Sequence, residues 1–174
     1  MSEDAAAQQE IISHLRAIPI FEHLDDDEVR KIYGICQVMR FEPDHVIYQF
    51  GHPSDSMFIL LDGQLVARTK TGVDIAYISP IGLVGEMGVI TDEVRSADVV
   101  TLDQSMGFQI SKDDLVKLFM EDGGVCRKIL LNMVKNLSTK LYDTNGEIEK
   151  PREAKVQKER EDGVPAQADN IFLY

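Results

Sequence analysis

Residues 84–100, VGEMGVITDEVRSADVV, hold the side chains of this 174-residue chain whose types and spacing best suit chemistry. Gly85 and Gly88 flank Glu86, and Arg95 follows nine positions after the acid. Glycines let a backbone approach a ligand closely, and an arginine fork suits phosphate oxygens. A carboxylate can accept a hydrogen bond from a sugar hydroxyl. The pattern predicts a pocket for one phosphate attached to a sugar; the alternative is a surface loop with one incidental ion pair.

The neighbouring residues fit the first interpretation. Ser96 offers a hydroxyl and a backbone N–H beside Arg95, and Ala97 keeps the chain narrow where a ligand would lie. Residues 86–90 can form one helical turn, whose free N–H groups attract an anion. One arginine does not suit a triphosphate, which usually needs more positive charge and a metal.

Catalytic patterns are poorly represented. The chain has no GxSxG, HExxH or P-loop lysine motif. Its histidines are scattered, and its two cysteines are far apart and lack metal-ligand spacing. We therefore expect a protein that is not an enzyme and has no metal site or cofactor. The four histidines are expected at the surface: His14, His23, His45 and His52.

The formal net charge of -12 limits the partners. Binding to DNA and to anionic membranes both rest on Lys and Arg side chains meeting phosphates, so neither partner is expected. The acidic N-terminus does not resemble a signal peptide, and no apolar run approaches membrane-spanning length. A cytoplasmic location is the resulting expectation.

The elements around residues 84–100 are predicted by periodicity. We expect a helix over residues 4–17 and a second helix that begins after an Asp25 cap. From 36 to 111 the chain has short β-branched or aromatic segments separated by turn signals such as Asp62-Gly63 and Pro80-Ile81-Gly82. This pattern predicts an antiparallel sandwich or barrel with a hairpin at TKTGVD.

Helices are expected again after the strands. Ser111 should cap a short helix, Asp122-Gly123-Gly124 should break the chain, and a longer helix should span 125–145. The apolar stripe of that helix suits packing against the barrel, a homodimer of parallel helices, or both on different faces. The charged segment 146–174 is expected to be a tail, and its closing IFLY is either a frayed end or a docking peptide.

The segment GEMGVITDEVRSADV, residues 85–99, resembles the phosphate-binding cassette of the cyclic nucleotide-binding domain family. That family includes the bacterial catabolite activator protein and the regulatory subunits of protein kinase A. Upstream, FEHLDDDEVRKIYGICQVMRFEPDHVIYQFG is similar to the entry helix and first strands of the family, and SMFILLDGQLV to a strand-turn-strand. Downstream, ISKDDLVKLF and the long helix continue the match. The resemblance implies a mainly β jelly roll with flanking helices, at residues 18–145, after an N-terminal helix at 1–17.

Residues 85–99 form the cassette, and the resemblance also assigns roles to its residues. It implies that Glu86 meets the ribose 2'-hydroxyl and that Arg95 pairs with the exocyclic phosphate oxygens. Ser96 and the amides near Met87 and Ala97 would assist. Base contacts are expected from the long helix, at Asn136, Thr139, Lys140 and Tyr142.

Two departures from the family pattern lie beside the cassette. The family often has an acid at the position of Gly82 and Phe at the position of Val84. Both changes affect the expected pocket wall and leave the phosphate contacts in place.

The function implied by the resemblance is a stand-alone sensor. It would bind cAMP or cGMP and signal through its C-terminal helix to an unknown protein partner or to a second copy. Bacterial dinucleotides suit a one-phosphate cassette less well. The alternatives are a scaffold that binds a partner protein without nucleotide and a truncated transcription factor.

Overall fold

The computed structural model describes residues 11–139. The chain divides into two units, residues 1–132 and 133–174. The helical and strand segments of the first unit are a helix at 11–16, η1 (Pro19–Phe21), α2 (Asp26–Gly34), β1 (Cys36–Phe41), β2 (Val46–Tyr48), β3 (Ser56–Asp62), β4 (Leu65–Arg68), β5 (Asp74–Ile78), β6 (Gly82–Val84), α3 (Glu86–Thr91), β7 (Asp98–Thr101), β8 (Ser105–Ser111) and α4 (Lys112–Glu121). A helix at 123–139 crosses into the second unit.

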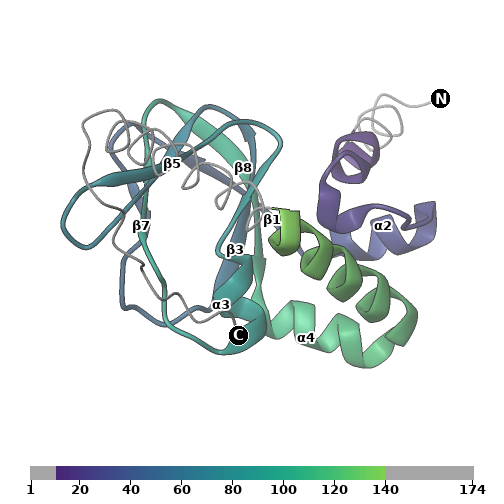
Figure 1. The fold of residues 1–174 in the computed structure, drawn as a ribbon. Helices are drawn as coiled ribbons and strands as arrows, with labels where there is room; N and C mark the ends of the chain where they lie inside the picture. Colours follow the sequence, from purple (N-terminus) through teal and green to yellow (C-terminus); the bar gives the residue numbers. More distant parts are fainter. Residues whose placement is uncertain (1–10, 140–174) are drawn as a thin grey trace, which may run out of the picture. The chain divides into compact units, whose positions relative to one another are not determined.

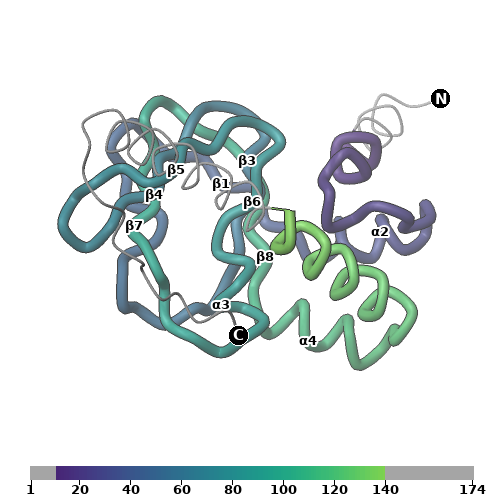
Figure 2. Tube along the Cα trace, viewed as in Figure 1, coloured from purple at the N-terminus to yellow at the C-terminus, as the bar shows by residue number. Residues whose placement is uncertain are grey.

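The eight strands form two antiparallel four-stranded sheets, in the orders β1-β8-β3-β6 and β2-β7-β4-β5 (Figures 1 and 2). The predicted antiparallel β-barrel is therefore confirmed. Side chains from both sheets meet in a shared core: Tyr48, Phe58, Leu60, Leu65, Val84 and Val99. The other side of the first sheet is also covered, since Tyr33 of α2 meets Phe108 of β8 edge to face, with ring centroids 6.1 Å apart. This explains why β3 is buried on both faces.

Local signals placed two elements correctly. Asp25 caps α2 through a reciprocal capping box, in which its side chain accepts from the Glu28 N–H and the Glu28 carboxylate accepts from the Asp25 N–H. The TKTGVD segment turns between β4 and β5, where Gly72 has φ +81° and donates to the Thr69 carbonyl. The helix cap and the turn both depend on contacts between residues close in sequence, which is why local capping and turn signals identified them.

Two predicted boundaries are wrong. Gly82, expected in a turn, begins β6 and pairs with Leu60 of β3. The predicted break at Asp122-Gly123-Gly124 is limited to Asp122, because the next helix begins at residue 123. The Asp122 carboxylate accepts from the Gly124 and Val125 N–H groups, so it serves as the cap of that helix.

The helices that precede and follow the barrel in the sequence are joined to one another within the first unit. Lys31 of α2 pairs with Asp122 at 2.5 Å, and Lys128 pairs with Glu28 at 2.6 Å. Asn132, which is buried, donates through Nδ2 to the carbonyl of Ile20 at 3.2 Å and to that of Glu22 at 2.7 Å. Segments about a hundred residues apart are thus linked by specific polar contacts.

Candidate functional site

The cassette begins where β6 ends. Gly85 has φ +81°, a left-handed conformation that favours glycine, and it is the N-cap of α3. A Cβ at this position would lie 2.5 Å from Arg95 Nη1 and 2.7 Å from Tyr48 Cε2. Gly85 therefore serves both the turn and the close approach of the arginine. The helical turn expected at 86–90 is confirmed as α3.

Arg95 is a buried cation, with 5% of its surface exposed. Its Nη2 donates to the Ser56 carbonyl at 2.7 Å, and its Nη1 donates to the Gly85 carbonyl at 3.2 Å. Asp55 supplies the nearby negative charge, with Oδ1 3.3 Å from Nη2. The backbone of Arg95 is fixed too, because its N–H donates to the His52 carbonyl at 2.8 Å. The guanidinium is held by groups at the first residue of β3, on the loop before it and at the start of the cassette.

Tyr48 supplies the surface on which Arg95 rests. The guanidinium carbon lies 3.6 Å from the centroid of the Tyr48 ring, a cation–π arrangement. Burial raises the pKa of the Tyr48 phenol above its usual value, and the nearby Ser56 hydroxyl and Arg95 charge oppose that shift. The phenol therefore stays neutral beside the cation.

A cavity of about 100 Å³ lies against Arg95. Six of the seven residues predicted for the cassette site line it, and Ala97 does not. Within this set Glu86 is buried at 6% exposure, whereas Met87 is half-exposed. The structure brings the predicted residues together, and their roles toward a ligand stay predictions. The lining consists of Ser54, Gly85, Glu86, Met87, Gly88, Glu93, Val94, Arg95 and Ser96.

Several residues of the site were missed from the sequence. Tyr48, Asp55 and Ser56 hold Arg95, and Ser54 lines the cavity, although all four precede the cassette by at least 29 residues. The only available signal was the polar run PSDS directly before a buried strand. Such a run reads equally well as an ordinary loop.

The expected base contacts fall in the second unit. Asn136 and Thr139 belong to the helix at 123–139, where the Thr139 hydroxyl donates to the Lys135 carbonyl at 3.1 Å. Lys140 and Tyr142 lie outside the described residues. The base-contacting roles of all four stay predictions.

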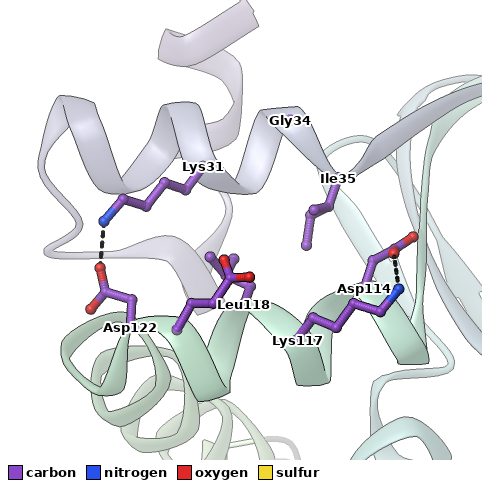
Figure 3. A pocket seen from close by; sticks show the side chains of 8 residues that line it. Lys31, Gly34, Ile35, Asp114, Lys117, Leu118 and Asp122 are labelled. Atoms are coloured by element: carbon purple, nitrogen blue, oxygen red, sulfur yellow. Dashed lines mark hydrogen bonds and ion pairs between the residues drawn. The ribbon is translucent and has the colours of Figure 1, made fainter.

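A larger cavity, about 470 Å³, lies between α2 and α4 (Figure 3). Its two lysines are both paired with acids of the same cleft: Lys31 with Asp122 at 2.5 Å and Lys117 with Asp114 at 3.5 Å. The cleft is thus neutralised internally and offers no cation that an anionic ligand would meet unopposed. Size alone does not make it the better candidate.

The cysteines and histidines of residues 11–139 limit the chemistry that this part of the chain can support. Cys36 and Cys126 are free thiols, and burial raises the pKa of Cys36 to about 12, so this thiol is poorly reactive. The four histidines are exposed, as predicted. Residues 11–139 contain no cluster of His, Cys, Asp or Glu that could hold a metal ion. No helix in that range is long and apolar enough to cross a membrane.

Known proteins provide an independent comparison. Residues 38–122 match the family model of the cyclic nucleotide-binding domain. Glutaminase 1 of Bradyrhizobium diazoefficiens is 24% identical over 131 residues, 75% of this chain and 21% of the glutaminase. The cGMP-dependent protein kinase egl-4 of Caenorhabditis briggsae is 26% identical over 106 residues, 58% of this chain and 14% of the kinase. The chain spans less than a quarter of the length of the curated relatives it matches, from 21% of the glutaminase to 14% of the kinase.

The fold has close structural counterparts. A cyclic nucleotide-binding domain from Methylobacillus flagellatus superposes with a TM-score of 0.73 and 22% identity, covering 84% of each chain. At this identity the likeness establishes the fold, a jelly roll with flanking helices. Together with the match over residues 38–122, it leads to one conclusion: the barrel of this chain belongs to the cyclic nucleotide-binding domain family.

Proposed function

We propose that this chain is a regulatory sensor that binds cAMP or cGMP at the cavity beside Arg95. The observation that carries the proposal is the convergence of a buried, pre-oriented guanidinium with Glu86 and Ser96 on one cavity. A guanidinium in a partly dry site attracts a phosphate more strongly than one in open water. The family of the barrel and the similarity to a cGMP-dependent kinase support the choice of ligand.

Each residue has a distinct task in the proposed complex. Arg95 would meet the two free oxygens of the cyclic phosphate, and Ser96 would add a hydroxyl beside it. The Glu86 carboxylate would accept a hydrogen bond from the ribose 2'-hydroxyl. These tasks need positioned donors and acceptors but no bond making, so the proposed role is binding and not catalysis.

The cavity volume bears on how the nucleotide would sit. Pockets that enclose a whole small molecule usually measure about 300–1,000 Å³, and this cavity measures about 100 Å³. It suits the phosphate and part of the sugar, so the base must lie outside it. Asn136, Thr139, Lys140 and Tyr142 are the proposed base contacts. If so, the helix at 123–139 and the residues after it carry the signal to a partner protein or to a second copy through residues 125–145.

A second candidate follows from the contacts that Arg95 already makes. Its Nη groups bond to the Ser56 and Gly85 carbonyls, and Asp55 neutralises its charge. A barrel in which the arginine has become a structural residue would act as a protein interaction module without nucleotide.

DNA is not among the proposed partners of either candidate, and this prediction rests on the net charge of -12.

Titration of the purified protein distinguishes the two candidates. cAMP and cGMP are added separately, with linear 5'-AMP and 5'-GMP as matched controls that share the bases and carry an open phosphate. A ligand at a hundredfold excess over Kd stabilises the folded state by about 2.7 kcal/mol, which raises Tm by several degrees. A shift with one cyclic nucleotide and none with its linear counterpart supports the sensor. An unchanged Tm with both cyclic nucleotides at millimolar concentration supports the interaction module.

A further inference from the structure

Ser54 lies on the loop between β2 and β3 and lines the cassette cavity. Ser54 as a whole is 9% exposed, and its Oγ atom is buried without a hydrogen-bond partner. The neighbouring Ser56 differs in this respect. Its hydroxyl lies 3.1 Å from the Asp55 carboxylate and 3.4 Å from Arg95 Nη2. Ser54 is thus the one hydroxyl of the cavity wall that is both buried and unsatisfied among the described residues.

An unsatisfied buried hydroxyl is unfavourable and calls for an explanation. Leaving such a group without a partner costs about 1–3 kcal/mol, and loop serines usually avoid the cost by bonding to nearby backbone groups. Alanine at this position would avoid it altogether. A serine at this position is most simply explained by a partner that arrives from outside the chain.

The surroundings of Ser54 indicate what that partner is. A Cβ at Gly88 would overlap both Oγ and Cβ of Ser54, so the backbone of α3 lies directly against the serine. The same cavity wall includes Arg95 and Glu86. A hydroxyl can donate to an anion without adding charge. Beside an arginine, the complementary ligand atom is a phosphate oxygen.

We propose that the Ser54 side chain turns about χ1 from its place against Gly88 and that its Oγ then donates a hydrogen bond to one of the two free oxygens of a bound cyclic phosphate. This inference rests on the proposed function and adds a contact from outside the cassette. The Arg95 cation is then joined at the phosphate by a neutral donor from the loop between β2 and β3. The two free oxygens become inequivalent, because the single proton of the Ser54 hydroxyl is donated to only one of them.

The first test compares Ser54→Ala with the parent protein, using the nucleotide that the parent binds more tightly. A hydrogen bond to a charged group is worth about 1.5–3 kcal/mol, so Kd should rise at least roughly tenfold. The Tm of the free variant should equal or exceed that of the parent, because an unsatisfied group has been removed. A merely structural serine would lower Tm instead. Ser79→Ala, an exposed serine outside the cavity, is the matched control and should change neither quantity.

The second test uses the two phosphorothioate diastereomers of the cyclic nucleotide, in which sulfur replaces one or the other free oxygen. Sulfur accepts hydrogen bonds poorly, so the parent should bind one diastereomer more weakly. In Ser54→Ala the part of that preference due to Ser54 should disappear. The Kd of the weaker diastereomer divided by the Kd of the tighter one should then be at least about threefold smaller in the variant than in the parent.

The outcomes separate this inference from the proposed function. A parent protein that binds neither cAMP nor cGMP overturns both. A parent that binds, together with a Ser54→Ala variant of unchanged Kd and unchanged diastereomer ratio, overturns only the role of Ser54. A variant with lower Tm, weaker binding and an unchanged ratio assigns Ser54 a structural role, which also overturns the inference.

Discussion

The guanidinium carbon of Arg95 lies 3.6 Å from the centroid of the Tyr48 ring. Tyr48 comes from β2 and Arg95 from the segment before β7, so the contact joins two parts of the chain that are adjacent in the second sheet. The ring provides a flat support, and the Ser56 carbonyl at 2.7 Å fixes one edge of the guanidinium. The orientation of the cation is therefore set before any ligand binds, which lowers the entropic cost of capturing a phosphate.

The first prediction tests this support. Tyr48→Leu removes the ring face and should lower stability by about 1–3 kcal/mol, from lost packing and a lost cation–π contact. Nucleotide binding should weaken about tenfold, because Arg95 gains freedom. Tyr48→Phe keeps the ring and is the matched control, with much smaller effects on both quantities. Thermal unfolding and titration calorimetry measure them, and equal losses in the two variants would contradict a role for the ring face.

Asp55 leads to the second prediction. Its carboxylate lies 3.3 Å from Arg95 Nη2 but is largely exposed, so the pair is worth at most about 1 kcal/mol. The carbonyl contacts hold Arg95 without it, and its charge repels an incoming phosphate. Asp55→Asn should therefore tighten nucleotide binding several-fold, and more so at low salt. Glu42→Gln removes an equal charge from the exposed connection between β1 and β2 and should have little effect. Weaker binding by Asp55→Asn would show that the carboxylate positions the arginine.

The third prediction uses two glycines with the same backbone conformation. Gly85 and Gly72 both have φ +81°, but a Cβ at Gly72 meets nothing within 4 Å, whereas one at Gly85 meets Arg95 and Tyr48. Gly72→Ala should cost about 1 kcal/mol from backbone strain alone. Gly85→Ala should cost more and should also weaken nucleotide binding, since Arg95 must move. Denaturant unfolding of both variants separates strain from displacement, and equal costs would exclude the steric part of the argument.

Sequence reasoning predicted the parts of the site that lie close together in the chain. Gly85, Glu86 and Arg95 were identified because their spacing carries the cassette pattern, and α3 formed where residues 86–90 were expected to turn. Sequence reasoning could not find Ser54 or Tyr48, whose relation to Arg95 depends on how β2 and β3 are placed. Such pairings join residues dozens of positions apart and leave no periodic signal.

Of the two errors in the fold, one comes from a distant pairing and the other from a local side-chain contact. Gly82 reads as a turn residue, and only its pairing with Leu60 makes it part of a strand. Gly123 and Gly124 read as a helix break, but the Asp122 carboxylate accepts from the N–H groups of Gly124 and Val125 and starts the helix there. In both cases a contact overrides the local preference of glycine.

The fourth prediction concerns pH. The Lys31 ammonium, which lies 2.5 Å from the Asp122 carboxylate (Figure 3), and then the Val125 N–H lower the pKa of Asp122 below its usual 3.8. A lowered pKa stabilises the folded state above about pH 4 and loses this contribution as pH falls through the folded value. Asp122→Asn should therefore show a shallower loss of stability under acid than the parent. Lys31→Met removes the ammonium but leaves the helix cap, and should have a smaller effect of the same sign. An Asp122→Asn protein with the acid dependence of the parent would contradict the assignment.

The last prediction separates anchoring from ligand contact in the helix at 123–139. Asn132 is buried and donates to the carbonyls of Ile20 and Glu22, so Asn132→Ala should leave both acceptors without that donor and lower stability by about 1–3 kcal/mol. Asn136, one helical turn later, is the proposed base contact. Asn136→Ala should keep the Tm of the free protein and weaken binding of the preferred nucleotide several-fold.

In hydrogen exchange, nucleotide should protect both residues 85–97 and the helix in the parent. In Asn136→Ala the helix should lose most of that added protection while residues 85–97 retain it. Equal protection of the helix in parent and variant would mean that Asn136 does not contact the base.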